Sequence, residues 1–159
     1  MKELDIETRI HLNINHKQLN INDSINFVTN NSSGAIAIFL GNTRDSNLGR
    51  SVKFLEYEAY EPMADKKLLQ IAQEMLQKWG INKVSIQHRT GKVALGETSL
   101  VVAVSSEHRK EAFSACEYSI IRIKEIVPIW KKEYYEDGEI WIGAQSGIVF
   151  EPKTKVDFR

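Results

Sequence analysis

The chain has 159 residues, of which 42% are hydrophobic and 26% charged, a composition typical of one globular domain spanning residues 1–159. Basic and acidic residues balance at 21 each, which argues against nucleic acid as a partner, and no apolar run is long enough to cross a membrane. The first five residues lack the basic and apolar parts of an export signal, and the single cysteine, Cys116, has no disulfide partner. We therefore expect a cytoplasmic protein.

The first third of the chain predicts two strands, a helix and a loop. Apolar residues at even spacing between Ile6 and Ile14 indicate an early strand, and residues 21–28 indicate a short helix. Residues 34–40 form an apolar run between glycines, which is typical of a strand buried on both faces. Residues 42–50 are rich in Asn, Gly and Ser and predict a loop.

The middle of the chain predicts a strand over residues 52–60 and then a long helix. Apolar residues recur with helical spacing over residues 63–79, and Gly80 is expected to end this helix. Residues 84–88 and 99–106 follow as two strands separated by a turn, and we expect them to pair in one sheet.

A second long helix is expected over residues 107–127, with Ser105 and Ser106 suited to capping its start and Pro128 ending it. Its predicted core stripe follows helical spacing and consists of Phe113, Cys116, Ile120, Ile123 and Val127.

The end of the chain predicts a short strand over residues 140–144 and an irregular tail over residues 147–159. Two long helices and several strands joined by short turns are typical of the α+β class. The expected fold is therefore two long helices packed on a mostly antiparallel sheet.

Two segments present cations where an anion could bind. Arg44 lies in the loop that leaves the first apolar strand, and a planar guanidinium binds phosphate through two hydrogen bonds. Residues 105–109 lie at a helix start, where free amides and the helix dipole favour phosphate, and Arg109 falls in line with the predicted core stripe. The alternatives are a solvated loop arginine and an ordinary ion pair of Arg109 with Glu107 or Glu111.

A third basic segment surrounds Pro128. Lys124 lies at the border of the predicted stripe, and Lys131 follows Trp130, whose ring is expected to anchor the segment. The alternative is that both lysines only lay their stems on the core. His88 and Cys116 are expected to be core residues, and no metal-ligand spacing is present. These residues together indicate a basic pocket for a small phosphorylated ligand.

Four blocks of the chain resemble the large, catalytic subunit family of molybdopterin synthase, and the match covers roughly residues 5–145. The blocks are residues 34–49, residues 55–63, Gln87-His88-Arg89-Thr90-Gly91, and residues 105–133 with Pro-Ile-Trp-Lys-Lys-Glu. The last block is the most specific because it combines Ser-x-x-His-Arg, a helix and a lysine-rich motif at fixed spacing.

The resemblance implies an α/β-hammerhead fold and a homodimer of large subunits. Each large subunit would hold one ubiquitin-like small subunit, giving a heterotetramer. Sulfur from the small subunit's C-terminal thiocarboxylate would pass twice to cyclic pyranopterin monophosphate and form the dithiolene of molybdopterin. This is a sulfurtransferase step of molybdenum cofactor biosynthesis, for which the resemblance implies no metal or organic cofactor and no membrane partner.

The resemblance also implies site residues. Lys124 and Lys131 would be catalytic, and we expect Lys124 to act as an electrostatic clamp and Lys131 to transfer a proton. Asp45 and Ser46 depart from the family pattern and are given no role. The residues implied to bind substrate are Asn42, Thr43, Arg44, His108, Arg109, Lys132 and Glu133. The competing hypothesis is a non-catalytic module that binds a ubiquitin-like tail or a phosphorylated metabolite.

Overall fold

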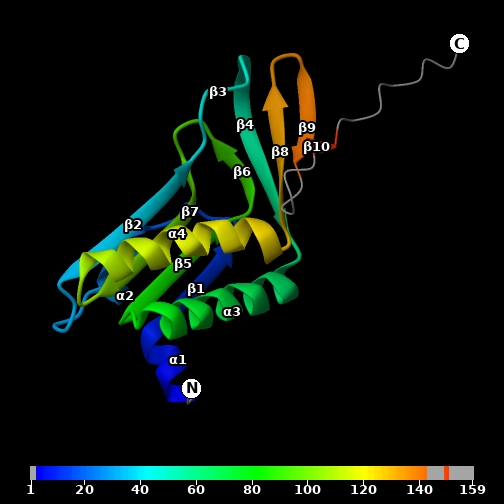
Figure 1. Cartoon of the computed structure of the whole chain (residues 1–159). Helices are drawn as coiled ribbons and strands as arrows, with labels where there is room; N and C mark the ends of the chain where they lie inside the picture. The colour runs from blue at the N-terminus through cyan, green and yellow to red at the C-terminus, as the bar shows by residue number, and fades with distance from the viewer. Residues whose placement is uncertain (1–2, 143–148, 151–159) are drawn as a thin grey trace, which may run out of the picture.

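The computed structural model describes residues 3–142 and 149–150, in which single helices are separated by single strands or by groups of consecutive strands (Figure 1). The elements, in chain order, are α1 (Glu3–Arg9), β1 (Ile10–Asn15), α2 (Ile21–Val28), β2 (Ala35–Asn42), β3 (Ser46–Asn47), β4 (Arg50–Ala59), α3 (Glu61–Trp79), β5 (Lys83–Arg89), β6 (Gly91–Ala94), β7 (Thr98–Ser106), α4 (Arg109–Ile126), β8 (Ile129–Tyr135), β9 (Gly138–Ile142) and β10 (Val149–Phe150).

The first sheet has the strand order β1-β5-β7-β2, in which only β1 and β5 run parallel. Helices α3 and α4 lie side by side across one face of this sheet (Figure 1). Fully buried Leu68 and Ile71 of α3 join Val84 of β5 and Val102 of β7 in one apolar core. Burial of these side chains is the main force that holds the helices on the sheet. The short helix α2 contacts β5 and β7.

The second sheet has the order β10-β9-β8-β4-β3, and β6 pairs with β4 beside this path. The strands β4, β8 and β9 extend away from the helical layer, and β8 begins just after α4 ends (Figure 1). This connection joins the carboxyl end of α4 to the second sheet, which matters for the site.

Several predictions from the sequence are confirmed. The helix over residues 21–28, the long helix before Gly80, and the antiparallel pairing of β5 with β7 are all present. Gly80 ends α3 in the left-handed conformation with φ 58°, and its amide donates to the Leu76 carbonyl at 3.1 Å. Glycine adopts this conformation without steric cost, which explains the sharp stop. The α+β class is confirmed, with α3 and α4 as the two long helices.

Other expectations about the strands are wrong. Ile6 belongs to the helix α1 rather than to a strand. β2 is not buried on both faces, because Ile36, Ile38 and Leu40 are between 39% and 41% exposed on an end strand of the sheet. The strands form two sheets instead of one, and the sequence did not predict β6 or β8. Val149 and Phe150 of the expected irregular tail pair with β9, and the other tail residues lie outside the described part of the chain.

Expectations about α4 also need correction. The helix starts at Arg109, two residues later than predicted, and its N-cap is His108. Ser105 and Ser106 do not cap it, because they are buried residues of β7. The buried face consists of Ala112, Ala115, Cys116, Ser119 and Ile123.

Phe113, placed in the predicted stripe of α4, is 66% exposed. Cys116 and Ile123 of the same predicted stripe are buried. Tyr118 and Arg122 hydrogen-bond to Glu74 of α3, and Phe113 lies about half a turn away from them around α4, on the side that α3 does not contact.

Candidate active site

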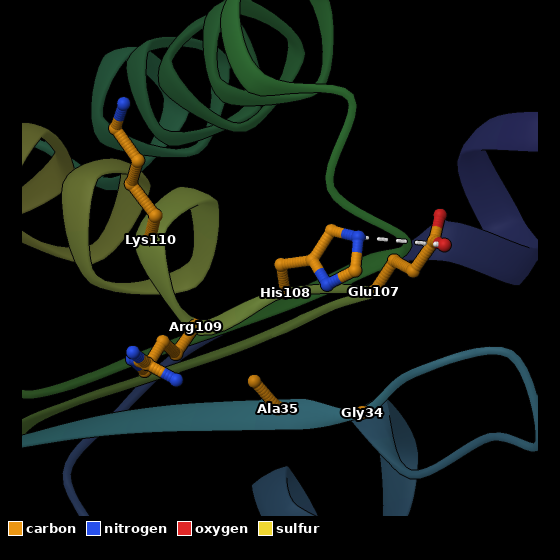
Figure 2. Close-up of a pocket in the computed structure, with 6 residues that line it drawn as sticks. All are labelled: Gly34, Ala35, Glu107, His108, Arg109 and Lys110. Atoms are coloured by element: carbon orange, nitrogen blue, oxygen red, sulfur yellow. Dashed lines mark ion pairs between the residues drawn. The ribbon is translucent and has the colours of Figure 1, made fainter.

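The amino end of α4 borders an open pocket of about 470 Å³. In Figure 2, Arg109 lies over Ala35 at the start of β2, while His108 points toward Glu107. The residues that line the pocket are Gly34, Ala35, Glu107, His108, Arg109 and Lys110. Three of the six carry or can carry a positive charge, so the pocket suits an anion.

Close contact between two chain segments shapes this pocket. A Cβ atom on Gly34 would lie 2.6 Å from the Glu107 carbonyl oxygen, so only glycine lets the start of β2 approach the turn before α4. The N-cap His108 has an extended backbone, with φ −123° and ψ 152°, and its side chain does not cap the helix. The first amides of α4 therefore remain available to an anion, and the helix dipole favours negative charge there.

The side chains of the pocket are exposed and weakly restrained. His108 Nε2 lies 3.5 Å from Glu107 Oε1, and both side chains are about three-quarters exposed. Arg109 is exposed and, among the described residues, forms no ion pair with Glu107 or Glu111. The expectation that Arg109 lines a cavity is thus confirmed, although its guanidinium is not buried as its place in the predicted stripe implied.

The catalytic candidates lie at the other end of α4. Lys124 is exposed in the last turn of the helix, and Lys131 is the third residue of β8. The Lys131 ammonium forms an ion pair with Glu133, with Nζ to Oε1 at 3.2 Å. Trp130, expected to anchor this segment, is instead 40% exposed.

Glu133 is buried, and both of its carboxylate oxygens have partners. Asn47 Nδ2 donates to Oε2 at 3.0 Å, and the Tyr135 hydroxyl donates to the same oxygen. Burial raises the pKa of Glu133, but the two hydrogen bonds and the Lys131 charge outweigh it, so the pKa lies below its ordinary value. Glu133 is therefore a buried anion beside Lys131.

The loop that carries Arg44 lies beside this cluster, because its Asn47 hydrogen-bonds to Glu133. Thr43 is buried, and its backbone bonds to Gly96 and Glu97 hold the start of the loop. Asn42 is exposed and accepts a hydrogen bond from Thr98 at 2.7 Å. Arg44 is exposed. The structure thus brings the loop and the Lys131 segment together.

Lys132 faces away from this cluster. Its ammonium pairs with Glu139 at 2.9 Å, and that hydrogen bond raises the pKa of Lys132. Neighbouring residues of a strand point to opposite faces of the sheet. Lys131 and Lys132 therefore cannot line the same side of one site.

The two groups of cations are far apart within one chain. Arg109 and Lys124 are separated by the length of α4, which is roughly 22 Å at about 1.5 Å per residue. The structure therefore places Lys124 at one end of α4, followed along the chain by the strand whose Lys131 and Glu133 contact the Arg44 loop through Asn47, and places His108 with Arg109 at the other end. The single pocket expected from the sequence is divided in two.

Sequence reasoning missed four residues at these positions: Gly34, Asn47, Lys110 and Tyr135. The alternation of side chains along a strand is the signal that places Tyr135 on the face of Glu133 and Lys131. This alternation could not be applied because β8 was not predicted from the sequence.

The expectations that His88 and Cys116 are core residues are confirmed. His88 is buried and its Nδ1 lies 2.9 Å from the Arg89 carbonyl oxygen, while burial lowers its pKa to about 4. Cys116 is a buried core residue.

Within residues 3–142 and 149–150, no cluster of three or more His, Cys, Asp or Glu residues is arranged to hold a metal ion. In the same part of the chain, no helix has the length and apolar character needed to span a membrane.

Comparison with known proteins agrees with the resemblance read from the sequence. Residues 14–126 match the family described as MoaE protein. A molybdopterin synthase catalytic subunit of Bacillus subtilis (strain 168) is 48% identical over 139 residues, which cover 87% of this chain and 88% of that protein. Its counterpart in Staphylococcus aureus (strain N315) is 50% identical over 129 residues, with 81% and 87% covered. The crystal structure of Staphylococcus aureus molybdopterin synthase superposes with a TM-score of 0.79 at 46% identity, covering 82% of this chain and 96% of that one. The chain belongs to the MoaE protein family.

Proposed function

We propose that this chain is the catalytic subunit of a molybdopterin synthase. It transfers sulfur from the C-terminal thiocarboxylate of a ubiquitin-like small subunit to cyclic pyranopterin monophosphate, and two transfers form the dithiolene. The observation that carries this proposal is the presence of two separate cationic groups, one at each end of α4, in a chain of this family.

The two groups fit the two anions of the reaction. The phosphate of the pterin suits the amino end of α4, where His108, Arg109 and free helix amides converge. The thiocarboxylate suits the group that contains Lys124, Lys131 and Arg44, because a charged sulfur donor needs cations near its reacting end. Asn42 and Thr43 would shape the loop that presents Arg44. Lys132 would contribute through the opposite face of β8.

Sulfur transfer requires the two anions to meet, but the two cationic groups of one chain are separated by the length of α4. A second copy of the chain is therefore needed to bring the two groups together. Among the described residues, β2 pairs only with β7, which leaves its outer edge open. Its outward residues Ile36, Ile38 and Leu40 are apolar and exposed. An open, apolar edge strand favours pairing with another strand. We infer a homodimer formed along β2.

An antiparallel pairing of two β2 strands has the symmetry that a dimer needs, because the same surface is used twice. The start of β2 in one copy then lies beside the end of β2 in the other. The pocket with His108 and Arg109 borders the start of β2, and the Arg44 loop follows its end. Each site would thus combine the phosphate pocket of one copy with the lysines of its partner.

The outer side of α4 supports the same arrangement. Tyr118 and Arg122 face α3, so residues about half a turn away around the helix face the open edge of the sheet. Arg109, Phe113 and Ile120 occupy this position. In a dimer along β2 the exposed Phe113 would be covered, which explains a large apolar side chain that the single chain does not bury.

A direct test mixes the purified chain with a thiocarboxylated small subunit and cyclic pyranopterin monophosphate and follows sulfur incorporation by mass spectrometry. The account expects a product that carries two sulfur atoms. Tight binding of the small subunit without product would instead identify a binding module. The reaction is proposed to take place in the cytoplasm.

A further inference from the structure

Glu133 is a buried carboxylate that does not line the pocket at the amino end of α4, although the family resemblance implies a substrate-binding role. Its side chain is 4% exposed, and its partners account for both oxygens. A residue in this position is poorly placed to contact a substrate. Its geometry fits a role in holding another side chain.

The partners of Glu133 contact different oxygens of its carboxylate. Asn47 and Tyr135 donate to Oε2, and Asn47 Nδ2 also lies 3.2 Å from the Tyr135 hydroxyl oxygen. Oε1 is thereby directed at the Lys131 ammonium, 3.2 Å away. Two donors from different strands, β3 and β8, fix one oxygen so that the other points at the lysine.

We propose that Tyr135 and Asn47 are positioning residues, which act through Glu133 to hold the Lys131 ammonium in place for sulfur transfer. This inference rests on the proposed function, because Lys131 is catalytic only in that reaction. Hydrogen bonds between charged groups are shorter and stronger than neutral ones, so a carboxylate that is itself held in place limits the positions that a long, flexible lysine can adopt.

The charged groups around Glu133 support this arrangement. Arg50 of β4 stacks on the Tyr135 ring with Cζ 3.8 Å from its centroid, and it pairs with Asp137 at 2.8 Å. Burial and the hydrogen bond to Glu133 raise the pKa of Tyr135, which keeps its hydroxyl protonated as a donor. Lys131, Tyr135, Asn47 and Arg50 thus all stabilise the anionic form of Glu133.

The test compares two tyrosine substitutions on adjacent residues of β8. Tyr135→Phe removes one donor to Glu133 and keeps the ring under Arg50. Tyr134→Phe is the matched control, because the Tyr134 hydroxyl donates to Glu56 at 3.2 Å and lies on the other face of the strand. Single-turnover sulfur transfer is measured for both variants from about pH 3 to 8, a range that extends below the ordinary carboxyl pKa of 4.5, together with the KM for cyclic pyranopterin monophosphate.

For Tyr135→Phe we expect the rate to fall several-fold with little change in KM. We also expect the acid limb of the pH–rate profile, where protonation of Glu133 lowers the rate, to move to higher pH by about one unit, since a lost hydrogen bond raises the pKa of the carboxyl group. Asn47→Ala should shift the limb in the same direction. Glu133→Gln, which cannot ionise, should remove the limb and most of the rate. Tyr134→Phe should match the wild type.

Identical pH profiles for Tyr135→Phe and Tyr134→Phe would overturn the positioning role. An equal loss of rate at every pH in Tyr135→Phe, with no shift of the limb, would also overturn it and leave only a structural role. Failure of the wild-type chain to transfer sulfur would refute the proposed function itself, so the two failures are distinguishable.

Discussion

The two ends of α4 hold their cations in different surroundings. At the amino end, His108 and Arg109 are exposed and border an open pocket. At the carboxyl end, Lys131 is paired with the buried anion Glu133, which two further residues hold in place. Exposed cations suit an anion that must enter and leave with each turnover. A cation fixed by a buried network suits a group that must keep one position during the chemical step.

The largest losses of activity are expected at the two lysines, which should differ in their effect on stability. Lys131→Ala and Lys124→Ala should both remove most of the activity. Only Lys131→Ala should also lower the free energy of unfolding, by about 1 kcal/mol, because it leaves Glu133 buried without its cation. Lys124 is exposed, so its removal should change stability by less than about 0.5 kcal/mol. Activity assays and urea unfolding measure both effects, and equal stability of the two variants would contradict the comparison.

A smaller and more selective effect is expected at the amino end. Arg109→Ala should weaken binding of cyclic pyranopterin monophosphate about tenfold or more, since a charge-assisted hydrogen bond contributes about 1.5–3 kcal/mol. Binding of the small subunit should change little, because its tail meets the other group of cations. Isothermal titration calorimetry with each ligand decides this, and equal losses for both ligands would remove Arg109 from the phosphate pocket.

The smallest effect on activity is expected on the side of α4 that faces α3, where Arg122 hydrogen-bonds to Glu74. Its hydrogen bonds, with Nη2 to Glu74 Oε1 at 3.1 Å, lower the pKa of Glu74 from 4.5 to about 2. This pair stabilises the fold fully above pH 4.5, and the contribution is lost as the pH falls toward 2.

Arg122→Ala should therefore cost about 1–2 kcal/mol of stability near neutral pH and lose less stability than the wild type on acidification. Its sulfur-transfer rate should stay close to the wild-type rate. Unfolding curves at several pH values provide the check, and parallel curves for the two proteins would show that the pair has no such role.

The sequence predicted the elements whose patterns are local. Helix α2 and the end of α3 at Gly80 follow from spacing and from one glycine. Strand β5 follows from the alternation of its side chains, and β7 follows from an apolar run. The helix-start pocket was also predicted, because Ser-x-x-His-Arg marks a strand followed by a helix. These features depend on residues that are near one another in the chain.

What the sequence did not predict depends on distant contacts. Helical spacing alone placed Phe113 of α4 in the core wrongly, because the side of the helix that is covered depends on where α3 and the sheet pack against it. The division of the site follows from the length of α4, which separates its two ends. The Glu133 network joins β3 to β8 across 86 positions of sequence, and a pattern search over short windows does not detect it.

The central claim is that one catalytic site combines the amino end of α4 from one copy with the carboxyl end from another. Lys131→Ala, which lacks most of its activity, and Arg109→Ala, which binds the pterin weakly, can be mixed, allowed to exchange subunits, and assayed for sulfur transfer at a pterin concentration well below the wild-type Kd. In a symmetric dimer, half of the pairs are mixed and each mixed pair has one intact site, so the account predicts on the order of a quarter of the wild-type activity. Activity no higher than that of the separate variants, with exchange verified by native mass spectrometry, would contradict it.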